Sequence, residues 1–188
     1  DESALLYKSI PEKSFCLKGQ TLSGGKLSKE RFTIHLCASL SGEKKKPLII
    51  GKSKKPRSFP KNLNLLPVDY ESSANSWMTA LIFANWLKAW DDELLKDNNR
   101  KIALLVDNCS AHPKEVEGLS QISIFFLPPN TTAIAQPLDQ GIIRCFKAWY
   151  RAALNKRIIA RLDSDPSADA NTVAKMVGLL GYMHWLLR

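Results

Sequence analysis

Three aspartates lie where carboxylates could serve phosphoryl chemistry: Asp1 at the chain start, Asp107 after the apolar run K-I-A-L-L-V, and Asp139 after Q-P-L. Hard divalent ions such as Mg²⁺ prefer carboxylate oxygens and are commonly held by one or two carboxylates together with substrate phosphate. If the three side chains converge, they suit metal-dependent phosphodiester chemistry. An aspartate after an apolar strand is also a common turn former or helix cap, so the residues alone leave both interpretations open.

Hydrophobic periodicity predicts the elements that would position Asp107 and Asp139. Residues 101–106 form a short continuous apolar run, typical of a buried central strand whose carboxyl end delivers Asp107. Residues 122–127 are again strand-like and stop at a pair of prolines, which block further pairing. From about 137 to 162, apolar residues recur at helical spacing and basic residues occupy the other faces, which predicts a long helix with Asp139 in its first turn.

The preceding half of the chain predicts strands, a basic loop and a helix. Residues 32–39 and 47–50 favour two paired strands, and Ser76 is expected to cap a helix that reaches about Lys96. Residues 51–64 are rich in proline and basic side chains and predict a surface loop. The order of these elements indicates an α/β fold built on a layered sheet. The basic side chains of interest in the loop are Lys52, Lys54, Lys55 and Arg57.

Composition limits the class of protein. A chain of 188 residues with 45% hydrophobic and 24% charged residues is expected to form one globular domain. The formal charge of +9 favours a polyanionic partner such as nucleic acid, although a solvated basic surface remains an alternative. The four cysteines form no C-x-x-C pair, which argues against a zinc site or a dense disulfide framework. No apolar run approaches the length of a membrane helix, so no membrane partner is expected.

Five blocks of sequence carry a family resemblance. They are D-E-S-A-L-L-Y-K, G-G-K-L-S-K-E-R-F-T-I-H-L-C-A-S, P-L-I-I-G-K-S-K-K-P-R, L-L-V-D-N-C-S-A-H-P and L-P-P-N-T-T-A-I-A-Q-P-L-D-Q-G-I-I. Together they resemble successive blocks of the DDE endonuclease domain in pogo and Tigger transposases, whose domesticated relatives include centromere protein B and the jerky proteins. The blocks follow the family's order and cover roughly residues 1–160, which makes the resemblance more specific than any single motif.

The resemblance implies a ribonuclease-H-like fold, a mixed sheet flanked by helices, with its first strand truncated in this sequence. It implies that Asp1, Asp107 and Asp139 are the catalytic, metal-binding carboxylates, with 31 residues between the last two. Two Mg²⁺ or Mn²⁺ ions would then serve in-line displacement at phosphorus. Residues 1–162 are expected to form the transposase core, and residues 163–188 a C-terminal helical extension of the same domain.

Further residues receive supporting roles. Asn108 and His112 follow Asp107 and could orient a water or contact a phosphate, or form a structural turn. Glu2 is the alternative ligand if Asp1 is misplaced. The basic loop is expected to contact DNA phosphates, with a solvated loop as the alternative. The string K-S-K-K-P-R also resembles a nuclear-localisation signal, which predicts a nuclear protein.

The sequence is compatible with two functions. The first is a metal-dependent DNA endonuclease or strand transferase, and the second is a domesticated nuclear DNA-binding or chromatin protein without catalysis. A plain α/β domain is a more remote third. The strand expected to precede and position Asp1 is absent, so we expect a fragment that is inactive or weakly active alone, with a helix-turn-helix DNA-binding region upstream. Whether the domain forms a homodimer stays open.

Overall fold

The computed structural model describes residues 1–7, 30–57, 59–60, 62–165 and 173. Within these residues, four strands form one mixed sheet in the order β1-β2-β3-β4, and two more form a separate parallel pair, β5-β6. In the larger sheet β1 and β3 are antiparallel to β2, whereas β4 runs parallel to β3. The strands are β1 (Glu2–Leu5), β2 (Phe32–His35), β3 (Leu48–Gly51), β4 (Asp69–Ser72), β5 (Ile102–Val106) and β6 (Ile122–Phe126).

The helices are α1 (Ala80–Lys96), α2 (Thr132–Ala135) and α3 (Ile143–Ser164), with the short helical segments η1 (Leu63–Leu65) and η2 (Leu138–Ile142). The expectation that Ser76 caps α1 is wrong. Thr79 is the cap, and its hydroxyl oxygen accepts a hydrogen bond from the Ile82 amide at 3.2 Å. Ser76 instead lies buried at φ 57°, and its carbonyl accepts a hydrogen bond from the Thr33 hydroxyl at 2.6 Å.

The long helix expected from residue 137 begins later, at Ile143. Gly141, within η2, takes φ +114°, outside the right-handed helical region, and this interrupts the helix ahead of α3. Asp139 therefore lies in η2, ahead of the break, rather than in the first turn of the long helix. The C-terminal helical extension expected over 163–188 lies outside the described residues, apart from 163–165 and Val173.

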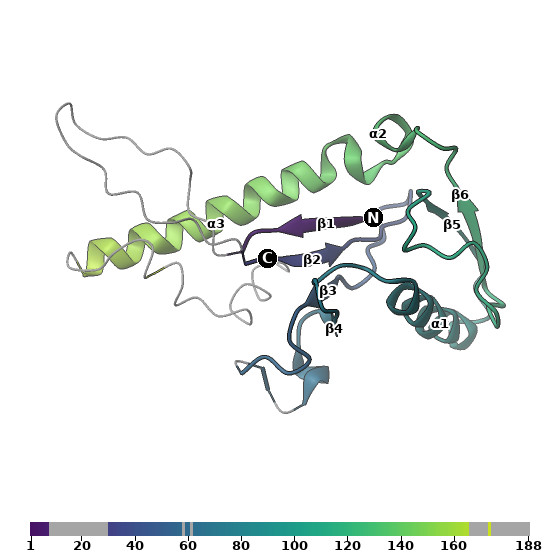
Figure 1. Cartoon of the computed structure of the whole chain (residues 1–188), viewed down its shortest axis with the longest axis horizontal. Coiled ribbons are helices and arrows are strands. Elements are labelled where there is room, and N and C mark those ends of the chain that lie inside the picture. Colours follow the sequence, from purple (N-terminus) through teal and green to yellow (C-terminus); the bar gives the residue numbers. More distant parts are fainter. Residues whose placement is uncertain (8–29, 58, 61, 166–172, 174–188) are drawn as a thin grey trace.

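Two hydrophobic cores cover the two faces of the larger sheet. Because side chains alternate along a strand, Ile34 and Ile49 face α3, whereas Leu48 and Ile50 face α1. The α1 core also takes in the inner faces of β5 and β6, so α1 joins the two sheets. Figure 1 shows α3 running alongside β1, and α1 beside the β5-β6 pair. None of the described helices combines the length and the apolar character needed to cross a membrane.

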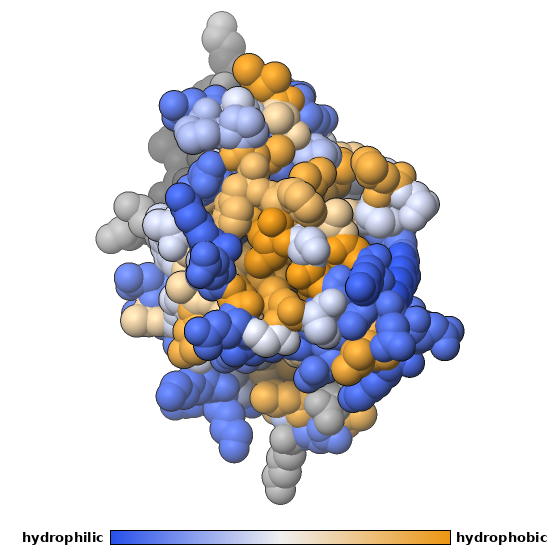
Figure 2. All heavy atoms as spheres, turned by 90° about the vertical axis from the view of Figure 1, so that its right-hand side faces the viewer, coloured by the Kyte–Doolittle hydropathy of each residue, from blue (hydrophilic) through white to orange (hydrophobic). Residues whose placement is uncertain are grey.

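β5 differs from the buried central strand that its apolar sequence predicts. It pairs only with β6 in the described part of the chain, and its residues alternate between partly buried and exposed, with Leu105 54% exposed. One face of the pair packs on α1 and the other is open, which explains the alternation. Figure 2 shows apolar side chains gathered in a hollow on the side of the molecule that carries β5, β6 and α1.

Candidate active site

Asp1 is held in place by the main chain. Its terminal amine donates to the Leu36 carbonyl at 2.9 Å, and its own carbonyl accepts from the Leu36 amide at 2.9 Å, which extends the β1-β2 ladder by one pair. Its Oδ1 atom accepts from the Glu2 amide at 2.8 Å, whereas its Oδ2 atom is buried and has no hydrogen-bond partner among the described residues. The Asp1 carboxylate is therefore held in place, with one oxygen hydrogen-bonded and the other without a partner among the described residues.

Glu2 points away from Asp1 because neighbouring side chains on a strand project to opposite faces. On the α1 side of the sheet, Glu2 Oε1 accepts hydrogen bonds from His35 Nδ1 at 2.7 Å and from His112 Nε2 at 3.1 Å. His35 is the residue paired with Glu2 across the β1-β2 ladder. The Glu2 carboxylate is therefore already occupied by two imidazoles, which leaves Asp1 as the available ligand of the two.

Opposing effects set the pKa values of Glu2, His35 and His112 in this cluster. Burial raises the pKa of Glu2, but hydrogen bonds from His112 and His35 outweigh burial and hold that pKa far below its usual range. Burial also lowers the pKa of His35, so this imidazole is neutral near pH 7. For His112, burial acts in the same direction, but the hydrogen bond to Glu2 and the nearby Asp107 raise its pKa overall. Glu2 is thus anionic, and His112 holds its second proton more firmly than a free imidazole does.

Asp107 follows β5 directly, as its position after the apolar run predicts. His112 Nδ1 lies 2.9 Å from Asp107 Oδ1, so one imidazole bridges this carboxylate and that of Glu2. Asn108 Nδ2 donates to the Leu127 carbonyl at 2.7 Å and ties the chain after β5 to the chain after β6. The two supporting residues therefore hold structure: Asn108 closes the end of the strand pair, and the buried His112 fixes Asp107 against β1.

Asp139 lies exposed in η2 and borders a groove of about 510 Å³ between β1 and α3. Ser3 lines the same groove. Because Asp1 and Ser3 occupy the same face of β1, the side chain of Asp1 projects toward the side of the sheet on which Asp139 lies. Asp107, in contrast, is joined to β1 through His112 on the α1 side. Among the described residues, no three His, Cys, Asp or Glu side chains lie close enough together to hold a metal ion.

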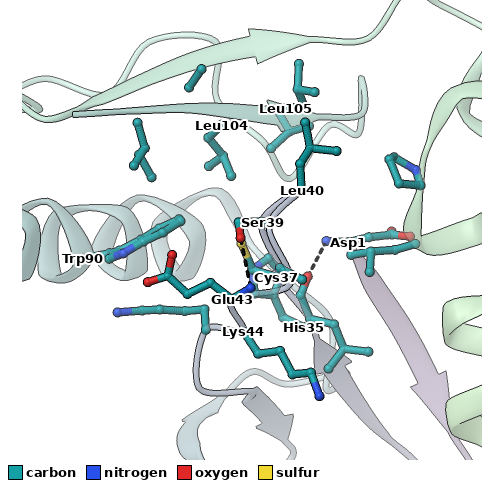
Figure 3. A pocket seen from close by; sticks show the side chains of 18 of the residues that line it. Asp1, His35, Cys37, Ser39, Leu40, Glu43, Lys44, Trp90, Leu104 and Leu105 are labelled. Carbon is teal, nitrogen blue, oxygen red and sulfur yellow. Dashed lines mark hydrogen bonds between the residues drawn. The ribbon is translucent and has the colours of Figure 1, made fainter. Parts of the chain in front are cut away.

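A second cavity, of about 940 Å³, lies between the end of β2, α1 and β5. Figure 3 shows Leu40, Leu104 and Leu105 along one wall, with Trp90 and Asp1 on opposite sides. This lining is largely apolar, with charged side chains that include Asp1, Lys45 and Arg100. Asp107 and Asp139 do not line this cavity, whereas Asp139 lines the groove beside α3.

The basic loop is exposed, as expected, and lies between β3 and η1. None of its four basic side chains lines the groove beside Asp139. Two features of the site escaped sequence reasoning, namely the Glu2-His35-His112 cluster and the basic face of α3 at the groove. His112 and Glu2 are 110 residues apart, so no local pattern pairs them. The sequence indicated the basic face of α3 only as positively charged residues on a predicted helix.

The fold and the site define an α/β domain with carboxylates placed at the ends of its strands. A family model described as DDE superfamily endonuclease matches residues 29–187, which is most of the chain. The chain therefore belongs to the DDE superfamily endonuclease family, and the resemblance noted in its sequence blocks is confirmed.

Similar proteins include transposon-derived and centromere proteins. Tigger transposable element-derived protein 4 of Mus musculus is 39% identical over 164 residues, which cover 87% of this chain and 31% of that protein. Tigger transposable element-derived protein 7 of Homo sapiens is 37% identical, over 80% of this chain and 30% of that protein. Major centromere autoantigen B of Homo sapiens is 32% identical, over 88% and 27% respectively. The chain thus spans about a third of the length of these relatives. No solved structure matches it.

Proposed function

We propose that this chain is the ribonuclease-H-like catalytic core of a DDE transposase, which cuts DNA phosphodiester bonds with Mg²⁺ or Mn²⁺. Asp1, Asp107 and Asp139 are the residues that would hold the metal. The observation that carries the proposal is the buried Oδ2 atom of Asp1, which lacks a hydrogen-bond partner among the described residues. Burying a carboxylate oxygen is unfavourable unless a donor or a cation meets it, and carboxylate oxygens are the donors that hard divalent ions prefer.

Bound metal would supply charge neutralisation at the scissile phosphate and activation of a water or 3′-hydroxyl. The chain's own residues provide the positioning. The two ring nitrogens of His112 lie within hydrogen-bonding distance of the Asp107 and Glu2 carboxylates, so His112 limits rotation of the Asp107 carboxylate and ties the carboxyl end of β5 to β1. The positive φ of Gly141 turns the chain between Asp139 and α3, which leaves the Asp139 side chain exposed beside the groove.

The proposal extends to domain limits and partners. It assigns residues 1–162 to the transposase core and residues 163–188 to a C-terminal helical extension of the same domain. DNA is the proposed partner and the nucleus the proposed compartment, with the formal charge of +9 as support. The exposed basic loop is proposed to make sequence-independent phosphate contacts outside the groove, through Lys52, Lys54, Lys55 and Arg57.

A second candidate function is a nuclear DNA-binding or chromatin protein without catalysis. The observation that favours it is that the described residues do not gather three ligand side chains at one point. Similarity to a protein named major centromere autoantigen B is compatible with it. Under this alternative the carboxylates would be retained for structure, as the bonds of Asp107 to His112 and of Asp1 to the Glu2 amide illustrate.

The test uses the natural polypeptide that contains this chain. Nicking of supercoiled plasmid is measured with Mg²⁺, Mn²⁺ or EDTA, for the natural protein and for Asp107→Asn and Asp139→Asn. Asp92→Asn is the matched control, because Asp92 is an exposed carboxylate on α1 away from the site. Binding of Mn²⁺ is measured separately by calorimetry, so that ligand loss is seen without relying on turnover.

Catalysis predicts metal-dependent nicking that falls at least about 100-fold in both site variants and is unchanged in Asp92→Asn, with weaker Mn²⁺ binding in the site variants. DNA binding without nicking by the natural protein, and Mn²⁺ binding that is equal in all variants, would establish the non-catalytic alternative. Nicking that survives both substitutions would show that other residues carry the chemistry.

A further inference from the structure

The groove beside Asp139 has a basic wall. Along α3, Arg144, Lys147 and Arg151 face it, whereas Ser3 of β1 forms the opposite side. Figure 1 shows α3 running alongside β1 over much of the length of this strand. Three cations thus line a groove of about 510 Å³ that Asp139, a proposed metal ligand, also lines.

The spacing of these cations suits a linear polyanion. Residues that are three and seven positions apart lie on roughly one face of a helix, and seven residues rise about 10.5 Å along its axis. One strand of duplex DNA carries a negative charge about every 3.4 Å along its axis, so the row spans about three phosphates. The groove therefore offers one cation for each of about three successive charges.

The three cations lack acidic partners of their own. In the part of the chain that the structure describes, none of them forms an ion pair, whereas Arg161 further along α3 pairs with Asp165 at 3.5 Å. Partial burial and the adjacent charge of Arg151 lower the pKa of Lys147, and Asp139 acts in the opposite direction. Of the three cations, Lys147 is partly buried, whereas Arg144 and Arg151 are exposed. Neighbouring cations of like charge are stabilised when an anion binds between them.

We propose that this groove binds the phosphate backbone of the DNA strand to be cut and leads it past Asp139. The inference rests on the proposed function, because a metal at Asp139 would remove the one repulsive charge in the groove. The proposal distinguishes two kinds of phosphate contact. The α3 groove aligns the reacting strand, and the basic loop after β3 contacts DNA elsewhere.

The test compares two triple variants of equal charge in the natural polypeptide that contains this chain. One is Arg144→Gln, Lys147→Gln and Arg151→Gln. The matched control is Lys156→Gln, Arg157→Gln and Arg161→Gln, on the following turns of α3. Binding of a fluorescent DNA duplex is measured by anisotropy at salt concentrations from about 50 to about 300 mM. Circular dichroism verifies helix content, and the single Arg144→Gln variant is carried in parallel in case the triple variant unfolds.

The slope of log K against log salt is negative, and loss of three phosphate contacts reduces its magnitude by about 2.7 and weakens binding about 100-fold near 0.1 M salt. The control triple is expected to change this magnitude by less than about 1, and Arg144→Gln alone to reduce it by about 0.9. A groove variant whose slope and affinity match those of the control triple would overturn the inference. So would an Arg144→Gln slope that equals that of the natural protein.

Nicking separates this inference from the proposed function. If the natural protein nicks DNA and the groove variant binds and nicks equally well, the groove inference fails and the catalytic proposal stands. If the natural protein shows no metal-dependent nicking but the groove variant loses DNA affinity, the groove is a DNA site and catalysis is the part that fails. Loss of RNA binding with unchanged DNA binding would also overturn the inference.

Discussion

Asp91 joins α1 to the start of β6, and its replacement should loosen the strand pair that delivers Asp107. The Asp91 side chain is buried on α1, with the residue 4% exposed. One carboxylate oxygen accepts from the Gln121 and Ile122 amides at 2.7 and 2.8 Å, and the other from the Ser120 amide and hydroxyl at 2.9 and 3.0 Å. Four donors therefore depend on a single carboxylate.

These hydrogen bonds determine how far the Asp91→Asn substitution should lower the free energy of unfolding. Asparagine keeps one oxygen for two amides, but its NH₂ group replaces the oxygen that faces Ser120, so one backbone N–H loses its acceptor. An unsatisfied donor costs about 1–3 kcal/mol, and each of the two retained bonds loses about 1 kcal/mol of charge assistance. The free energy of unfolding should therefore fall by about 3–5 kcal/mol. The neighbouring Asp92→Asn should change it by no more than about 0.5 kcal/mol, because Asp92 is exposed.

Urea unfolding followed by circular dichroism measures both variants, at pH 6 and pH 3, which are about two units above and one unit below the usual carboxyl range. Burial alone would raise the pKa of Asp91, but the hydrogen bonds from the Ser120, Gln121 and Ile122 amides hold it below its ordinary value of 3.8. The stabilisation is therefore complete above that ordinary value and is lost as the pH falls through the lower folded value. The difference in free energy of unfolding between the natural protein and Asp91→Asn should therefore be smaller at pH 3 than at pH 6. Equal costs for Asp91→Asn and Asp92→Asn would refute the reasoning.

Two further substitutions test the segments that position Asp107 and Asp139. Gly141→Ala should lower the free energy of unfolding by about 1–3 kcal/mol, because φ is +114° there, and it should also reduce metal-dependent nicking. Gly42→Ala, at φ +89° in a distant hairpin, should cost similar stability in thermal unfolding and leave nicking unchanged, and equal nicking by both would contradict the role given to Gly141. Asn108→Ala removes the bond to the Leu127 carbonyl and should cost about 1 kcal/mol in urea unfolding. An unchanged unfolding midpoint would show that this bond does not hold β5 and β6 together.

Much of the fold follows from local pattern. The paired strands expected over 32–39 and 47–50 are confirmed as β2 and β3, and α1 and β6 lie close to their expected ranges. Apolar periodicity reports which residues can be buried on one face of an element, so it locates elements well. It also places Asp107 at the end of β5, because a strand cannot bury the charged residue that follows it.

The rest of the fold depends on contacts between residues that lie far apart in the sequence. β4 (D-Y-E-S) has no apolar alternation and forms because it pairs with the buried β3. Nothing local distinguishes the buried Asp91 from the exposed Asp92, since the acceptor role of Asp91 requires a loop about 30 residues further on. The rule that an unbroken apolar run is a buried central strand failed for β5, because the burial of a strand depends on neighbouring strands that the run itself does not specify.

The open edge of β5 has a consequence for the behaviour of the protein in solution. The strand reads I-A-L-L-V, without a charged residue or a proline, and within the described residues only β6 pairs with it. An unprotected apolar edge of this kind is a template for strand addition by another copy of the same chain, the route that leads to cross-β aggregates. Concentrating or warming the isolated chain should therefore promote its self-association. β5, the strand that directly precedes Asp107, is therefore a segment that needs protection from amyloid-like pairing.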